Sequence, residues 1–93
     1  MGWNPEVTVA AIVELDGRFL MVEERISGRL VLNQPAGHLE DGETLLAAAI
    51  RETREETGLE VEIRGLVGVY SSPGNPVIVV AFAAEPQIGR AHV

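Results

Sequence analysis

The chain has 93 residues, 46% of them apolar and none of them cysteine, and its 14 acidic and 7 basic side chains give a formal net charge of −7. This length supports one hydrophobic core, so residues 1–93 are expected to form a single domain, and the apolar fraction excludes intrinsic disorder. The lack of cysteine excludes disulfides and thiolate metal sites, and the acidic charge argues against nucleic acid or an anionic membrane as a partner.

The N-terminal segment predicts a β-hairpin. Residues 6–15 are rich in β-branched side chains and are apolar on both faces at their centre, which is typical of a strand buried on both sides. Asp16-Gly17 is a turn dipeptide, so residues 18–23 are expected to return as the second strand. The segment resembles neither a signal peptide nor a membrane span, and we therefore expect a cytoplasmic protein.

A short strand and a loop are predicted next. Residues 30–32 are a third strand candidate, because they are apolar and follow a break at Ser27-Gly28. Residues 33–42 show no hydrophobic period and contain one proline and two glycines, Pro35, Gly37 and Gly42. This second segment is therefore predicted to be a loop.

Residues 44–57 predict a helix. The segment has three consecutive alanines and no internal glycine or proline, and Gly58 follows it as a C-terminal stop. Asp41, Glu43 and Thr44 are candidates for the N-terminal cap. On a helical wheel, the side expected to face the core is formed by Leu45, Leu46, Ala49, Ile50 and Thr53.

Two further strands are expected after the helix. Residues 59–70 are strand-like but interrupted by Gly65 and Gly68, residues 71–76 form a turn cluster, and residues 77–84 are wholly apolar. Together with the N-terminal strands, these elements predict an α/β (α+β) fold with a single helix on a sheet.

Three carboxylates, those of Glu52, Glu55 and Glu56, gather on one side of the predicted helix. Their like-charge pairs destabilise a helix by roughly 0.2–0.5 kcal/mol each, and the helix dipole disfavours negative charge near the C-terminus. A solvated acidic face is one interpretation. The other is a bound divalent cation, which would remove both conflicts; oxygen ligands without histidine or cysteine favour Mg²⁺ or Mn²⁺.

The spacing around these carboxylates resembles the Nudix box, G-x5-E-x7-R-E-U-x-E-E-x-G-U, in which U is a bulky aliphatic residue. Every fixed position matches, and only Thr53, at the first U, departs from the pattern. The matching residues are Gly37, Glu43, Arg51, Glu52, Glu55, Glu56 and Gly58, with Leu59 at the last U. Residues 7–10 and 33–40 are most similar to the NudJ-type nucleotide phosphatases within the family.

The resemblance implies a Mg²⁺- or Mn²⁺-dependent hydrolase (MutT-like, a pyrophosphohydrolase or phosphatase). Its substrate would be a nucleoside di- or triphosphate, or a related nucleoside-diphosphate-linked metabolite, and metal-activated water would cleave the phosphoanhydride bond. The metal ligands would be Glu52, Glu55, Glu56 and the Gly37 carbonyl. Arg51 and Glu43 would pair to hold the loop and helix in shape, and either Glu55 or Glu56 would orient or deprotonate the water.

The resemblance also implies a mixed β-sheet sandwich with a second, C-terminal helix that this chain lacks. We therefore expect a domain truncated at its C-terminus and a homodimer, with or without exchanged elements, that covers the bare sheet face. The alternative is a catalytically idle Nudix-like module that binds nucleotides or a protein partner.

Four residues besides the fixed positions of the box have two interpretations each. His38 is a base or substrate contact, or a solvated loop residue; Arg25 and Arg29 meet substrate phosphates, or are ordinary surface charges. Trp3 stacks on a nucleobase or packs near the N-terminus, and we expect the second.

Overall fold

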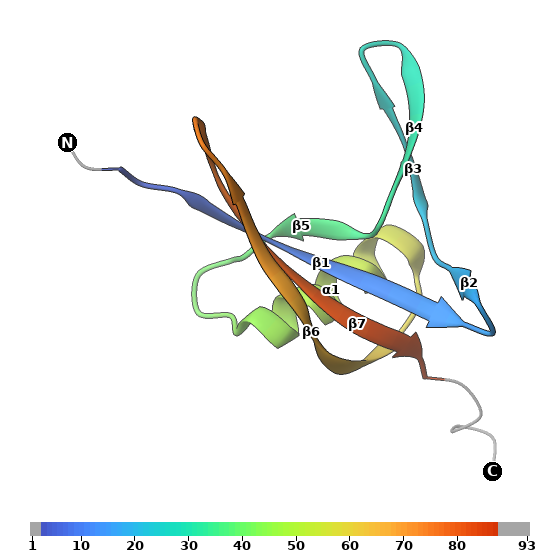
Figure 1. The fold of residues 1–93 in the computed structure, drawn as a ribbon. Helices are drawn as coiled ribbons and strands as arrows, with labels where there is room; N and C mark the ends of the chain where they lie inside the picture. Colours follow the sequence, from blue (N-terminus) through green and yellow to red (C-terminus); the bar gives the residue numbers. More distant parts are fainter. Residues whose placement is uncertain (1–2, 88–93) are drawn as a thin grey trace.

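The computed structural model describes residues 3–87. A five-stranded mixed sheet carries the helix on one face, and a separate two-stranded hairpin projects from it (Figure 1). The elements are β1 (Glu6–Leu15), β2 (Arg18–Phe19), β3 (Val22–Ile26), β4 (Arg29–Asn33), β5 (Ala36–His38), α1 (Leu45–Thr57), β6 (Val61–Ser72) and β7 (Asn75–Pro86). The predicted mixed α/β architecture is therefore confirmed, and residues 3–87 contain one helix.

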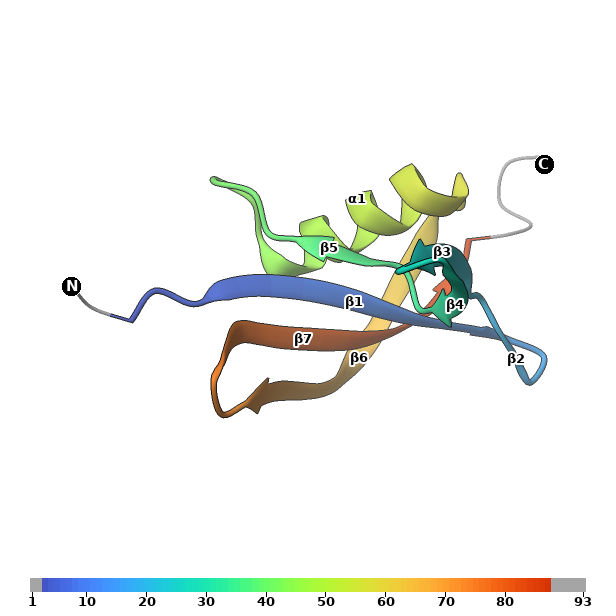
Figure 2. The ribbon, with the colours of Figure 1, turned by 90° about the horizontal axis from the view of Figure 1, so that it is seen from above.

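The sheet is built around β1. Its order is β2-β1-β7-β6, β5 also pairs with β1, and the β1–β7 pairing is parallel while the other pairings are antiparallel. Figure 2 shows α1 lying over β5 and β1 on one face of this sheet. Val9 on β1, Ala48 and Ala49 on α1, and Val80 and Phe82 on β7 form the core beneath the helix.

The predicted helix ends are confirmed. Thr44 is the N-cap, and its hydroxyl oxygen accepts a hydrogen bond from the Ala47 amide at 3.0 Å. Gly58 closes the helix with φ 76°, and its amide donates to the Arg54 carbonyl at 2.8 Å. Thr53, the departure from the box, is fully buried, and its hydroxyl donates to the Ala49 carbonyl at 2.8 Å. The polar group that replaces an aliphatic one is thus satisfied within the helix.

The helix faces the core through part of the predicted set: Ala49 and Thr53 are buried as predicted, whereas the two leucines are not. Ala48 and Ala49 are buried, whereas Leu46 is 48% exposed and Leu45 is 37% exposed. The small alanine side chains pack directly against β1 and β7, so the buried side of the helix is centred on Ala48, Ala49 and Thr53. The prediction for Leu45 and Leu46 was wrong for this reason.

Two strand predictions also needed correction. The predicted loop over residues 33–42 contains β5, which pairs with Thr8, Val9 and Ala10 of β1. The predicted strand over residues 18–23 is divided: β2 pairs with β1, but β3 leaves the sheet and pairs with β4 instead. Gly65 and Gly68 do not interrupt β6; the register with β7 shifts at both glycines while the strand continues.

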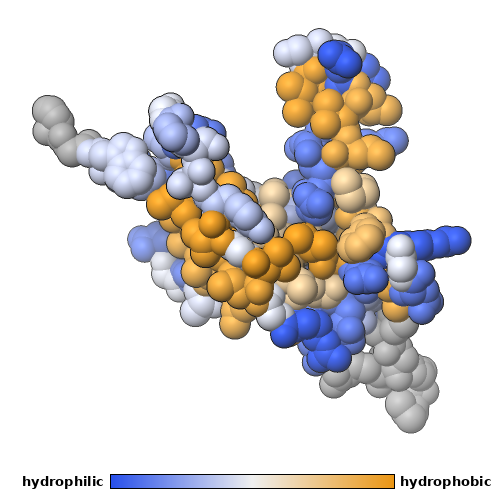
Figure 3. Space-filling model, viewed as in Figure 1, coloured by the Kyte–Doolittle hydropathy of each residue, from blue (hydrophilic) through white to orange (hydrophobic). Residues whose placement is uncertain are grey.

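One part of the sheet is uncovered within residues 3–87. The side chains of Leu66, Val69 and Tyr70 on β6 are 61%, 60% and 52% exposed. Figure 3 shows apolar residues gathered over the sheet and on the projecting hairpin. The described part of the chain has no helix long and apolar enough to cross a membrane.

The left-handed conformation of Gly58 predicts a specific sensitivity. Gly58→Ala should lower the free energy of unfolding by about 1 kcal/mol, because a Cβ disfavours φ 76°. The urea midpoint of unfolding measures the effect. Gly65→Ala is the matched control: a Cβ there meets nothing within 4 Å and φ is not positive, so its midpoint should stay near that of the wild type. Equal losses in both variants would contradict the prediction.

Candidate functional site

Arg51 of α1 connects the three segments of the site. Its Nε and Nη2 donate to the two carboxylate oxygens of Glu43, in the loop before the helix, and the Nη2–Oε1 distance is 3.0 Å. Nη2 also donates to the His38 carbonyl of β5 at 3.1 Å. The two side chains are only 15% and 14% exposed. This bidentate pair therefore holds loop, helix and β5 together.

The same guanidinium reaches two of the predicted metal ligands. Its Nη1 donates to Oε2 of Glu52 at 3.0 Å and to Oε1 of Glu55 at 3.1 Å. The hydrogen bond from Arg51 lowers the pKa of Glu43, and that same bond raises the pKa of Arg51. Both groups of this pair are therefore held in their charged forms.

Gly37 of β5 lies directly against Glu52. A Cβ on residue 37 would fall 2.0 Å from the Glu52 carboxyl carbon, so no side chain fits there while Glu52 keeps its place. The Glu52 side chain is 17% exposed. The fixed glycine of the box is thus explained by the close approach of the β5 backbone to a carboxylate.

Glu56 lies one turn further along the helix and binds the same strand. Its Oε1 accepts a hydrogen bond from the Ala36 amide at 2.9 Å. Partial burial raises the pKa of Glu56, and the nearby carboxylates of Glu52, Glu24 and Glu55 add to that rise. Negative charge at this edge of β5 is therefore electrostatically uncompensated around Glu56.

The donor set suits a hard divalent cation. Carboxylate oxygens of Glu52 and Glu56 lie against the backbone of β5: the Glu52 carboxylate fills the space beside Gly37, and the Glu56 carboxylate accepts from the Ala36 amide. Such oxygen ligands are those that hard cations prefer. Within residues 3–87, however, no three acidic or histidine side chains converge as a ready-made metal site. Glu55, 57% exposed, is turned toward Arg51. It would have to leave the guanidinium to join the other two.

A second polar group lies beside the box. From the sequence, Glu24 was open to two interpretations, an extra metal ligand or base and an ordinary exposed strand residue, and its pairing with Asn33 was not expected. Glu24 of β3 accepts a hydrogen bond from the Asn33 amide of β4 at 2.7 Å, and both residues line a cavity of about 260 Å³ that also contacts Glu56. The sequence feature that indicates this pairing is the Ser27-Gly28 dipeptide. In the structure it forms a two-residue hairpin turn, and both residues have positive φ. Such a turn sets the register and places Glu24 and Asn33 on one face.

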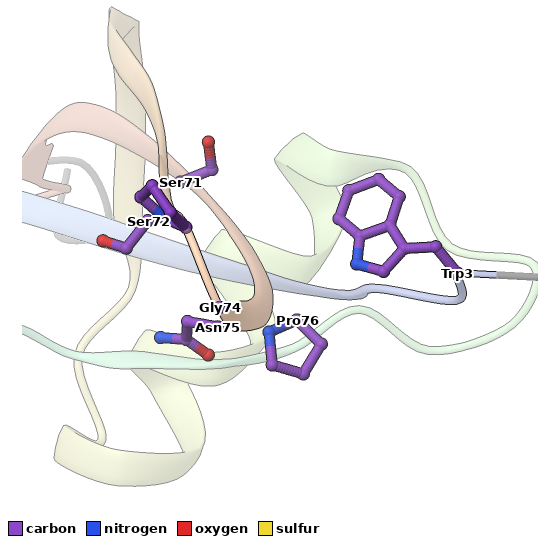
Figure 4. A pocket seen from close by; sticks show the side chains of 7 residues that line it. Trp3, Ser71, Ser72, Gly74, Asn75 and Pro76 are labelled. Atoms are coloured by element: carbon purple, nitrogen blue, oxygen red, sulfur yellow. The ribbon is translucent and has the colours of Figure 1, made fainter.

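The remaining candidates lie elsewhere. His38 pairs with Glu6 at 3.6 Å on the exposed side of β5. Arg25 donates to the Gly28 carbonyl at the tip of the hairpin. Trp3 does not pack: it is 73% exposed and lines an open cavity of about 590 Å³ opposite the β6–β7 turn (Figure 4). The packing prediction for Trp3 was therefore wrong.

The Glu43–Arg51 pair predicts a pH dependence of stability. Because folding lowers the pKa of Glu43 from its usual 4.5, its contribution to stability is fully present above about pH 4.5 and is lost as the pH falls through the lowered value. Glu43→Gln should therefore be less stable than the wild type at pH 7, and the difference should shrink below pH 4.5. Urea unfolding at a series of pH values measures it.

Glu40→Gln is the matched control for this prediction. The Glu40 carboxylate lies 3.6 Å from Arg51 but is 66% exposed, so its removal should change stability little at any pH. A stability gap between Glu43→Gln and the wild type that persists unchanged to pH 3 would refute the assignment.

Comparison with known proteins agrees with this geometry. The model of the NUDIX domain family matches residues 4–92. Phosphatase NudJ of Escherichia coli strain K12 and that of Shigella flexneri are each 55% identical over 86 residues, covering 89% of this chain and 56% of the relative. The chain thus spans about half the length of the curated relatives that it matches.

Solved structures show the same fold. A NUDIX hydrolase from Nitrosomonas europaea superposes with a TM-score of 0.83 at 38% identity, covering 96% of this chain and 64% of that one. An ADP-ribose pyrophosphatase from Streptococcus suis gives a TM-score of 0.80 at 21% identity over 94% of this chain and 64% of its own. Taken with the family match and the assembled box, these similarities establish that the chain belongs to the Nudix family.

Proposed function

We propose that this chain is a divalent-metal-dependent hydrolase of phosphoanhydride bonds. Its substrate is a nucleoside di- or triphosphate or a related nucleoside-diphosphate-linked metabolite. The observation that carries the proposal is the placement of two box carboxylates against the β5 backbone, Glu52 at Gly37 and Glu56 at the Ala36 amide. The name of the NudJ relatives, which are phosphatases, supports the same class of reaction.

Glu52, Glu55, Glu56 and the Gly37 carbonyl would hold Mg²⁺ or Mn²⁺. When bound, the cation offsets the charge of the phosphates and lowers the pKa of a coordinated water. Arg51 and Glu43 act as positioning residues, because their pair fixes the helix against the loop and β5. Their role is to hold Glu52 in place, without contacting the reacting atoms themselves.

If one helix glutamate serves the attacking water instead of binding the cation, Glu56 is better placed than Glu55 to orient or deprotonate that water. It lines the 260 Å³ cavity, and its pKa is raised by burial. A carboxylate with a raised pKa accepts a proton more readily near neutral pH. Glu55, in contrast, is engaged by the guanidinium of Arg51.

Charge-neutral substitution of the box carboxylates tests the proposal. Glu52→Gln and Glu56→Gln should each lower kcat/KM for nucleoside triphosphates with Mg²⁺ by about 100-fold or more, because each removes an anionic oxygen ligand. Release of phosphate or pyrophosphate is the measurement. Glu60→Gln is the control and should retain wild-type activity, because Glu60 lies beyond the helix and its carboxylate pairs with Arg54.

Thermal unfolding gives a second readout that does not depend on turnover. Mg²⁺ should raise the Tm of the wild type and of Glu60→Gln, but not that of Glu52→Gln, since a ligand that binds only the folded state stabilises it. A wild type that hydrolyses no nucleoside phosphate would support the idle, nucleotide-binding module instead. Full activity in Glu52→Gln would exclude metal binding by the box.

We also propose that the chain forms a homodimer through β6. Among residues 3–87 this strand is at the edge of the sheet, and it exposes Leu66, Val69 and Tyr70. A second copy would cover these apolar side chains and pair with the edge of β6. Sedimentation at micromolar concentration should show a dimer for the wild type and a monomer for Val69→Glu. The control, Val67→Glu, should have a smaller effect, since Val67 is less exposed. A wild type that is only monomeric would overturn the proposal.

A further inference from the structure

Trp3 and the β6–β7 turn border an open hollow outside the box. The parallel pairing of Glu6 with Val77 places the residues that precede β1 beside this turn. The indole of Trp3 forms one side of the hollow, and the turn forms the other (Figure 4). We call it the Trp3 hollow; its volume is about 590 Å³, and it is lined by Trp3 and residues 71–76.

The indole is the apolar side of the Trp3 hollow. Tryptophan is highly buried on average in folded proteins, whereas Trp3 is 73% exposed. A flat ring that stacks on the indole removes apolar surface of both partners from water, and offset stacking of two aromatic rings is itself favourable. This side of the hollow therefore favours a ligand with an aromatic ring.

The turn supplies polar groups on a rigid frame. The side chains of Ser71, Ser72 and Asn75 are exposed, and their hydroxyl and amide groups can donate hydrogen bonds to a ligand and accept them from it. The register with β7 shifts between Ser71 and Ser72, and Pro76 lies in the resulting bulge, where its missing amide proton costs no ladder hydrogen bond. With Pro73 in the turn as well, few backbone dihedrals remain to be ordered when a ligand binds.

The lining of the Trp3 hollow is uncharged. Within residues 3–87 it consists of one indole, two hydroxyls, one amide, two proline rings and a glycine. It offers no guanidinium or ammonium group to a phosphate and no carboxylate to a cation. The cavity beside Glu56, in contrast, is lined by two carboxylates. The Trp3 hollow therefore suits an uncharged ring that carries hydrogen-bonding groups.

The Trp3 hollow adjoins the cavity beside Glu56. A small hollow of about 80 Å³ shares three of its lining residues and also contacts Val79, which lines the Glu56 cavity. Val79 and Asn75 are four residues apart on β7, which corresponds to at most about 13 Å of extended strand. A ribose with its attached phosphates is long enough to bridge this distance. One ligand can therefore place its phosphates at the box and its ring at Trp3.

We infer that Trp3 stacks on the base of a nucleoside and that the polar groups of the β6–β7 turn hydrogen-bond to the same nucleoside. The inference rests on the proposed function, because the base is the aromatic ring of the proposed substrate. Every base has a π-face, so stacking on Trp3 binds the nucleoside without selecting among bases.

The fluorescence of Trp3 tests the inference directly, because Trp3 is the only tryptophan of the chain. Adenosine and uridine, which carry no phosphate, are titrated in the absence of metal. Saturable quenching by at least one of them is expected, and ribose alone should leave the emission unchanged. Quenching by both nucleosides that is only linear, with the slope found for free N-acetyltryptophanamide, would overturn the inference, as would an equal response to ribose.

Substitution of Trp3 provides a second test, with nucleoside affinity measured by equilibrium dialysis. Trp3→Ala should weaken the affinity about tenfold, and Trp3→Phe, which keeps an aromatic face, should weaken it less. Leu30→Ala is the matched control: it removes another exposed apolar side chain, 58% exposed on the β3–β4 hairpin, and should keep the affinity. Wild-type affinity in Trp3→Ala, with a normal Tm, counts against the assignment.

The outcomes separate this inference from the proposed function. A wild type that binds nucleosides at Trp3 but hydrolyses no nucleoside phosphate would refute the hydrolase and leave the nucleoside site in place. If both hold, Trp3→Ala should raise KM for nucleoside triphosphates about tenfold. A wild type that hydrolyses them, with the same KM in Trp3→Ala and no quenching by nucleosides, would refute the nucleoside site alone.

Discussion

The structure of the site depends on one partly buried guanidinium. Arg51 is 15% exposed, and its donors are shared among Glu43 in the loop, Glu52 and Glu55 on the helix, and the His38 carbonyl on β5. A charge held away from water is stable only where partners replace its hydration, so these segments have few alternative arrangements. The planar, five-donor geometry of arginine makes this connection, and lysine has no equivalent.

Small residues allow the close packing of helix and strands that the site requires in addition to the Arg51 hydrogen bonds. Ala48 and Ala49 let α1 lie close to β1, and the absence of a side chain on Gly37 lets Glu52 reach the β5 backbone. The same close packing brings carboxylates together: burial raises the pKa of Glu56 first, and the neighbouring carboxylates of Glu52, Glu24 and Glu55 add to that rise. The excess negative charge of the chain is thus partly concentrated at one edge of β5, where a cation would relieve it.

The projecting hairpin adds a hydrogen-bonded polar pair, Glu24 and Asn33, beside this edge. Within residues 3–87, β3 leaves the main sheet and pairs with β4, and the tight turn between them places Glu24 beside Asn33. These polar groups face Glu56 across a cavity whose floor comes from β1. The box and the hairpin are separate local structures, and β1 and β5 supply the surface on which they meet.

The sequence by itself determined the elements that depend on local interactions. The helix ends follow from the capping residues Thr44 and Gly58. The box could be identified from the sequence because it is a fixed spacing of residues along the chain. Tertiary structure alone decided that Ala36–His38 becomes a strand, that Ala48 replaces Leu46 in the core, and that Glu24 faces Glu56. Strand pairing, helix rotation and cavity formation depend on contacts between residues distant in sequence, and no local pattern encodes the energies of those contacts.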